Sequence, residues 1–136
     1  FKKQRKIDRL IYILNNLNWE YNTVTNNNGG TVFYIQVPFE YPVYNTLDRW
    51  VNLQCVTSEW CSDFVSESAL WDGHRVDDED NRVTYGSVIE SNTDTLQAIA
   101  SLAGYRTNKK TVPDDRKETY SDYYRLHIVK INFLLT

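Results

Sequence analysis

The chain has 136 residues, of which 41% are hydrophobic and 24% charged, as in an ordinary soluble globular domain with a fair core. It contains no run of about 20 apolar residues, so the sequence predicts no membrane span. The formal net charge of −3 argues mildly against a nucleic-acid partner. Acidic clusters at 77–80 and 114–115 and basic clusters at 2–6 and 105–110 nevertheless allow one basic face.

Hydrophobic periodicity and turn signals predict helices alternating with pairs of strands. Asn18 is a plausible left-handed helix stop, and "NNNGG" at 26–30 is typical of a tight hairpin turn. Thr57 or Ser58 is suited to cap a helix. In chain order we expect a helix at 4–17, strands at 19–25 and 31–37, a short helix at 46–53, a helix at 57–71, a hairpin at 74–88, a helix at 92–103, and strands at 105–112 and 119–133.

The two cysteines, Cys55 and Cys61, form no CxxC pair and no zinc-type spacing. A helical segment between them would place them on different faces, so we expect reduced cysteines and an intracellular protein. The chain contains no Met and begins with the bulky Phe1, which indicates a fragment, a processed product or an excised segment. Sequence that belongs to the fold is therefore expected upstream.

The stretch "ALWDG" raises a question about the end of the helix predicted at 57–71. Gly73 is suited to end that helix in a left-handed conformation. Asp72 would then face the negative end of the helix dipole, which is mildly unfavourable for a carboxylate. A bound cation would remove that conflict, so the sequence makes Asp72 a candidate metal ligand.

The predicted order helix, stop, strand, loop, strand occurs twice, at 4–37 and at 92–133. In both copies an aromatic residue follows the helix stop, Trp19 after Asn18 and Tyr105 after Gly104. This pattern indicates a weak internal duplication. We therefore assign 1–53 to the remainder of a first repeat plus a connector, and 54–136 to a second repeat.

A helix that ends in Asp-Gly, followed by two strands, a helix and two strands, resembles a LAGLIDADG homing endonuclease of the kind found inside inteins, introns and phage genes. The resemblance rests on "RWVNLQCVTSEWCSDFVSESALWDGHR" and "NRVTYGSVIESNTDTLQAIASLAGYRT". It implies an α/β (α+β) fold in which helices pack on a curved antiparallel saddle. Glu67 and Trp71 depart from the small residues that are usual in the motif helix, and the first motif helix is absent.

The resemblance also implies a chemistry and a partner. Each motif helix of the family delivers one Asp to a shared metal site, and Asp72 with Gly73 is the one matching position here. Mg²⁺ or another divalent cation would then support sequence-specific cleavage of double-stranded DNA. The missing motif would come from an upstream segment or a second chain. The implied location is the cytoplasm of a bacterial or phage-infected cell, or an organelle.

Polar residues on the predicted strands are the candidate DNA contacts, because period-two alternation exposes one side of each strand. They are Tyr34, Gln36, Arg82, Thr84, Arg106, Lys109, Lys110, Arg125 and His127. Two other functions remain open. One is an inactive, maturase-like module that binds DNA or RNA without cutting it. The other is a structural or interaction domain of a larger assembly, which the acidic net charge favours.

Overall fold

A computed structural model describes residues 1–41, 46–75, 82–113 and 122–130. The chain divides into two compact units, unit 1 at Phe1–Val43 and unit 2 at Tyr44–Thr136. The acidic cluster at 77–80 and most of the segment 113–118, between the last two predicted strands, lie outside the described residues. Among the described residues, no helix is long and apolar enough to cross a membrane. The assignment of 1–53 and 54–136 to two copies of a repeat stays a prediction.

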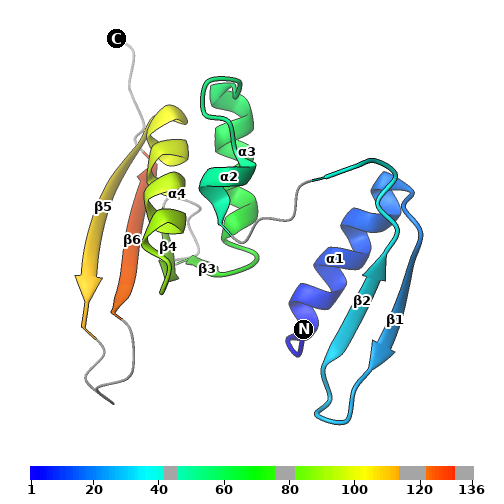
Figure 1. The fold of residues 1–136 in the computed structure, drawn as a ribbon. Coiled ribbons are helices and arrows are strands. Elements are labelled where there is room, and N and C mark those ends of the chain that lie inside the picture. The colour runs from blue at the N-terminus through cyan, green and yellow to red at the C-terminus, as the bar shows by residue number, and fades with distance from the viewer. Residues whose placement is uncertain (42–45, 76–81, 114–121, 131–136) are drawn as a thin grey trace. The chain divides into compact units, whose positions relative to one another are not determined.

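Unit 1 is a helix beside a two-stranded antiparallel sheet (Figure 1). Helix α1 spans Gln4–Leu17, strand β1 spans Tyr21–Thr25 and strand β2 spans Thr31–Ile35. Asn18 ends α1 with a φ of 56°, as its residue type predicts. Gly29 turns the hairpin with a φ of +81°, which side chains other than glycine rarely adopt.

Unit 2 is a four-stranded antiparallel sheet with the order β3-β4-β6-β5, and helices α3 and α4 cover one of its faces (Figure 1). Its elements are α2 (Leu47–Trp50), α3 (Ser58–Ser68), β3 (Gly73–Arg75), β4 (Arg82–Ser87), α4 (Glu90–Leu102), β5 (Tyr105–Val112) and β6 (Tyr123–Lys130). The described residues thus form a mixed α+β fold with two antiparallel sheets, but the predicted LAGLIDADG saddle is not confirmed.

The core of unit 2 lies between the helices and the sheet. It consists of Cys61, Val65, Ala69, Val83, Tyr85, Leu96, Ile99, Ala100, Leu126 and Ile128. The strand members alternate with less buried residues, as expected for a sheet covered on one face only. Both cysteines are free, and burial raises the pKa of the Cys61 thiol.

Helix α3 begins after Thr57, as the predicted cap residue indicates, but it ends earlier than predicted. The Thr57 side chain accepts a hydrogen bond from the Trp60 backbone N–H at 3.1 Å, which satisfies one free donor of the first turn. The helix was expected to reach Trp71, but it ends at Ser68 and is followed by a turn. Asp72 therefore lies beyond the helix, just before β3.

Candidate functional site on the outer face of the unit 2 sheet

One face of the unit 2 sheet is not covered by α3 and α4. Val83 and Leu126 are buried toward the helices, so their neighbours along the strands lie on the opposite side. We call that side of β4, β6 and β5 the outer face. Its residues are Arg82, Thr84, Gly86, Arg106, Asn108, Lys110, Val112, Tyr123, Arg125, His127 and Val129.

Strand register arranges the cations of the outer face in two rows. The first row runs across the strands: Arg125 on β6 lies between Gly86 on β4 and Lys110 on β5. Arg82 and Arg106 lie on either side of Val129, four residues further along β6. Strand spacing and rise make this area roughly 10 Å by 14 Å. The sequences of β4, β5 and β6 contain no Asp or Glu, so the four positive charges meet no opposing charge from these strands.

The middle of the outer face is hollowed. A hollow of about 630 Å³ is lined by residues of β4 and β6, including Thr84, Arg125 and His127. Thr84 Oγ1 lies 3.4 Å from His127 Nδ1, a weak hydrogen bond that links the two strands. The Arg125 guanidinium carbon lies 5.9 Å from the centre of the Tyr123 ring, within cation–π range. The structure thus brings together six predicted contact residues, Arg82, Thr84, Arg106, Lys110, Arg125 and His127.

Gly86 makes room for the Tyr123 ring on the outer face. A Cβ atom at Gly86 would lie 1.5 Å from Tyr123 Oη and 2.0 Å from Cζ. The ring therefore lies across the glycine of the neighbouring strand, as aromatic side chains do when they cover a glycine in a sheet. Tyr123 also lines the hollow, so Gly86 fixes one wall of it.

We expect Gly86→Ala to displace the Tyr123 ring and to lower the free energy of unfolding by about 1 kcal/mol. In a Tyr123→Ala background the clash is absent, so the same glycine substitution should be neutral or slightly stabilising. Urea unfolding of the two single variants and the double variant measures this coupling. Equal effects of Gly86→Ala in both backgrounds would contradict the packing of the ring on Gly86.

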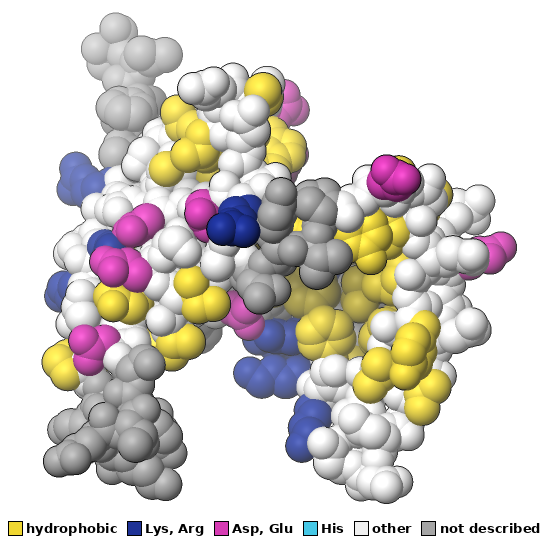
Figure 2. Space-filling view, in the orientation of Figure 1, with side chains coloured by type: hydrophobic (Ala, Val, Ile, Leu, Met, Phe, Trp, Pro, Cys, Tyr) yellow, Lys and Arg dark blue, Asp and Glu magenta, His cyan; other side chains and the backbone are white. Residues whose placement is uncertain are grey.

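Lys109 does not belong to the outer face, although the sequence grouped it with Arg106 and Lys110. Its Nζ donates to Asp94 Oδ1 at 2.5 Å and to Glu90 Oε1 at 2.7 Å, both on α4. These hydrogen bonds raise the pKa of Lys109 above its usual range. Acidic side chains are visible over the part of unit 2 that α4 occupies (Figure 2). Successive residues of β5 point to opposite faces of the sheet, so Lys109 lies on the helix side. The prediction that placed Lys109 with Arg106 and Lys110 did not apply this alternation.

Gly73 has a packing role and not the predicted helix-ending role. Its φ is not in the left-handed region, which among the described residues contains only Asn18, Gly29 and Gly104. A Cβ at Gly73 would lie 2.7 Å from the Ser68 carbonyl oxygen and 2.8 Å from Ala69 Cα. Glycine is therefore needed because β3 passes directly against the end of α3.

We expect Gly73→Ala to lower the free energy of unfolding by about 1–3 kcal/mol, because backbone atoms cannot move aside cheaply. Gly104→Ala is a contrasting control. A Cβ there meets nothing within 4 Å, and its cost comes from a φ of +88° alone. Thermal unfolding measures the loss of stability of each variant. Wild-type stability of Gly73→Ala would contradict the close approach.

Asp72 is exposed in the turn before β3 and lies close enough to Tyr85 to influence its titration. Burial raises the pKa of Tyr85, and the charge of Asp72 raises it further. Among the described residues, no group of three or more His, Cys, Asp or Glu side chains could hold a metal ion. Mg²⁺ at Asp72 and Gly73 therefore stays a prediction without a matching cluster.

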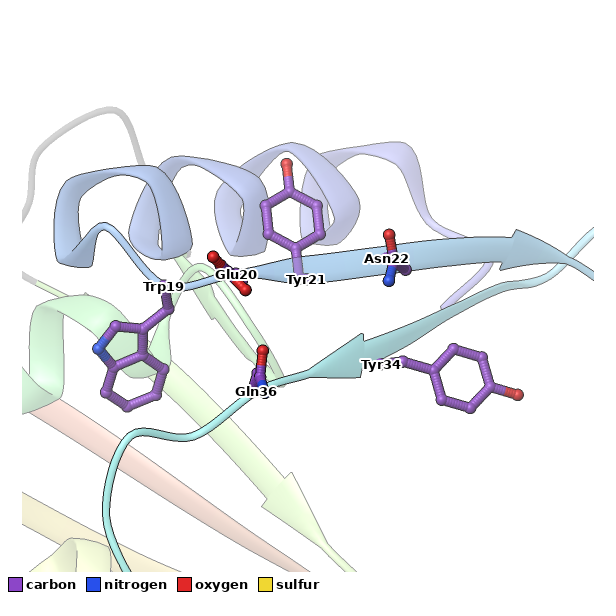
Figure 3. A pocket seen from close by; sticks show the side chains of 6 residues that line it. All are labelled: Trp19, Glu20, Tyr21, Asn22, Tyr34 and Gln36. Carbon is purple, nitrogen blue, oxygen red and sulfur yellow. The ribbon is translucent and has the colours of Figure 1, made fainter.

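Tyr34 and Gln36 lie in unit 1 and line a separate hollow of about 430 Å³. Figure 3 shows Tyr34 and Trp19 pointing away from α1, whereas Tyr21 points toward it. Tyr34 is 61% exposed, so its ring is available to a partner. Among the described residues, no cationic side chain lines this hollow, so it is chemically unlike the outer face of unit 2.

Sequence reasoning missed Tyr123, Gly86 and Asn108 as members of the outer face. Asn108 lies two residues from both Arg106 and Lys110, so the alternation along β5 could have placed it on the same face. The contact of Tyr123 with Gly86 depends on strand pairing between residues 37 positions apart, and no local pattern carries that information.

The fold and the outer face define an α+β chain whose second unit carries a cationic sheet surface. No protein-family model matches the chain, and no solved structure matches it. Among curated proteins it is similar to the ribonucleoside-diphosphate reductase subunit beta of Aquifex aeolicus (strain VF5), with 36% identity over 116 residues. The match covers 79% of this chain and 16% of the relative, so the chain spans about a sixth of that protein.

This comparison corrects the family prediction. The relative is named as a ribonucleotide reductase subunit and not as a LAGLIDADG endonuclease, which contradicts the predicted family and the predicted endonuclease function. It is a reductase and not a phosphodiester hydrolase, so the predicted enzyme class is contradicted as well. Its name indicates ribonucleotide reduction, and not homing, intein or DNA-binding functions.

Proposed function

We propose that unit 2 is a binding module for an extended, phosphate-bearing polyanion, and that the outer face is the binding surface. The observation that carries this proposal is the set of four cations in two rows on one sheet face whose strands contain no acidic residue. Phosphate oxygens attract Arg and Lys, and Arg pairs with them in a planar, two-pronged geometry. Support for the proposal comes from this geometry alone.

The spacing of the cations favours an extended ligand over a single small phosphate compound. The two rows of cations, Arg125 with Lys110 and Arg82 with Arg106, are separated by roughly 14 Å along the strands. One strand of a nucleic-acid duplex places a phosphate about every 3.4 Å along the axis, so this distance spans about four phosphates. A DNA duplex carries such a regular series of phosphates and is therefore the probe that we propose to use.

The acidic net charge does not oppose this proposal, because the charges are segregated. Glu90 and Asp94 lie on α4, on the side of the sheet away from the outer face, and pair with Lys109 there. A surface of one sign can steer an oppositely charged ligand even when the whole protein carries the other sign.

The experiment is a binding titration of a labelled 20-base-pair duplex at several salt concentrations, with ADP and inorganic phosphate as competitors. We expect the logarithm of the association constant to fall linearly with the logarithm of salt, with a slope of about −3 to −4 for four phosphate contacts. ADP should compete weakly, because it spans only part of the cation rows. Equal competition by ADP, or no duplex binding at low salt, would contradict the proposal.

A second candidate function is contact with another polypeptide through α3. Trp60 is 39% exposed at the start of this helix, and its ring centre lies 5.1 Å from that of Phe64. A largely apolar hollow of about 290 Å³ lies between α3 and α2 and is lined by Phe64 and Leu47. Hydrophobic side chains gather over this part of unit 2 (Figure 2). A second chain or an upstream segment, as the sequence suggested, would cover them.

Sedimentation at rising protein concentration tests this second candidate for a second copy of the chain. Self-association that Trp60→Ser abolishes would support it. A monomer at all concentrations would contradict coverage of this surface by a second copy of the chain.

A further inference from the structure

Strand β2 has one paired edge and one edge that faces away from β1. The Gln36 N–H donates to the Glu20 carbonyl at 2.9 Å, and the Asn26 N–H donates to the Gly30 carbonyl at 2.9 Å. In an antiparallel pair the hydrogen-bonded positions alternate, so Val32 and Tyr34 also direct their backbone groups toward β1. The backbone groups of Thr31, Phe33 and Ile35 therefore point to the other edge.

Phe1 already occupies the beginning of that other edge. The Phe1 ammonium donates to the Thr31 carbonyl at 2.6 Å, and the Thr31 N–H donates to the Phe1 carbonyl at 2.7 Å. Two residues that exchange both hydrogen bonds form one rung of an antiparallel ladder. The Phe1 ring also meets the Phe33 ring edge-on, with centres 6.2 Å apart. Beyond this rung, no hydrogen bond at that edge involves the backbone of Phe33 or Ile35 within the described part of the chain.

In unit 2, the strand that corresponds to β2 is β6, and its corresponding edge is paired with a strand. There, β4 ends at Ser87, three residues before α4 begins at Glu90, and it runs antiparallel along β6. In unit 1, Phe1 likewise lies three residues before α1 begins at Gln4. Helix α4 and strands β5 and β6 have the same order and pairing as α1, β1 and β2. Phe1 thus takes the place that Ser87 takes in unit 2.

We infer that the outer edge of β2 takes a third, antiparallel strand, formed by the polypeptide directly before Phe1 when this chain is part of a longer protein. The register follows from the Phe1–Thr31 rung. The residue two positions before Phe1 pairs with Phe33, and the residue four positions before Phe1 pairs with Ile35. Both share the sheet side of Phe1 and Phe33. This strand covers backbone groups that would otherwise be an exposed edge.

Amide hydrogen exchange, read by NMR, tests this inference residue by residue. The 136-residue chain is compared with one that carries the roughly six residues that precede Phe1 in its longer protein, enough to span β2. We expect the amides of Phe33 and Ile35 to exchange at least about tenfold more slowly in the longer chain. The amides of Val32 and Tyr34 are internal controls, because they already donate to β1 and should change little.

Two outcomes would overturn the inference. One is unchanged exchange at Phe33 and Ile35, and the other is an equal slowing of all four amides, which would indicate general stabilisation without a new strand. A matched variant of the longer chain carries proline two positions before Phe1, where the N–H should pair with the Phe33 carbonyl. This variant should lose the protection of Phe33 and Ile35 while α1 stays folded by circular dichroism.

Discussion

Replacing Arg82, Arg106 and Arg125 together by glutamate is expected to weaken duplex binding on the order of 100-fold and to make the salt slope about three units shallower. These three side chains supply most of the positive charge of the outer face, and their exposure means that the fold does not depend on them. Fluorescence anisotropy with the same duplex measures the loss of affinity, and thermal unfolding checks that unit 2 remains folded.

Lys109 and Lys110 provide a matched control for this prediction, because they are neighbours with the same charge on opposite faces of β5. Lys110→Gln should weaken binding and make the salt slope about one unit shallower. Lys109→Gln should leave binding unchanged, since that ammonium pairs with Asp94 and Glu90 on the helix side. If both substitutions weaken binding equally, the effect comes from net charge alone and the outer face is not the binding surface.

Leu96→Ala is expected to lower the free energy of unfolding by about 2–5 kcal/mol, because Leu96 is fully buried between α4 and the sheet and its removal leaves a cavity. Leu102→Ala removes the same atoms from the same helix at a position that is 49% exposed, and it should cost less than about 1 kcal/mol. Urea unfolding followed by circular dichroism measures both values.

The contrast between these two leucines tests where the core of unit 2 lies. A large cost at both positions would mean that the exposed end of α4 is covered by another part of the protein. A small cost at both positions would contradict the position of the core between α4 and the sheet.

Local signals in the sequence predicted local structure well. The helix at 4–17 and its stop at Asn18 are found as predicted, because both depend on residues within one or two turns of each other. The strand at 105–112 is also found with the predicted limits. The same alternation that predicts this strand would also have placed Lys109 on the helix side.

Features that depend on distant parts of the chain were not predictable from local pattern. Helix α3 ends at Ser68 and not at Trp71, and β3 then passes so close to Ser68 and Ala69 that only glycine is accommodated at 73. The sequence suggested a helix cap at Gly73. A glycine that ends a helix and a glycine that allows close packing cannot be distinguished from the local sequence. The family prediction rested on the order of elements, and the named relative contradicts it.

The most direct test of the outer face is a map of backbone amide shifts on unit 2 as the duplex is added at low salt. We expect the largest shifts at Arg82, Thr84, Arg125 and His127, which line the hollow between β4 and β6. Residues of α4 on the opposite side of the sheet should shift little. Shifts that gather on α3 and α4 while the outer face stays unchanged would contradict the proposed binding surface.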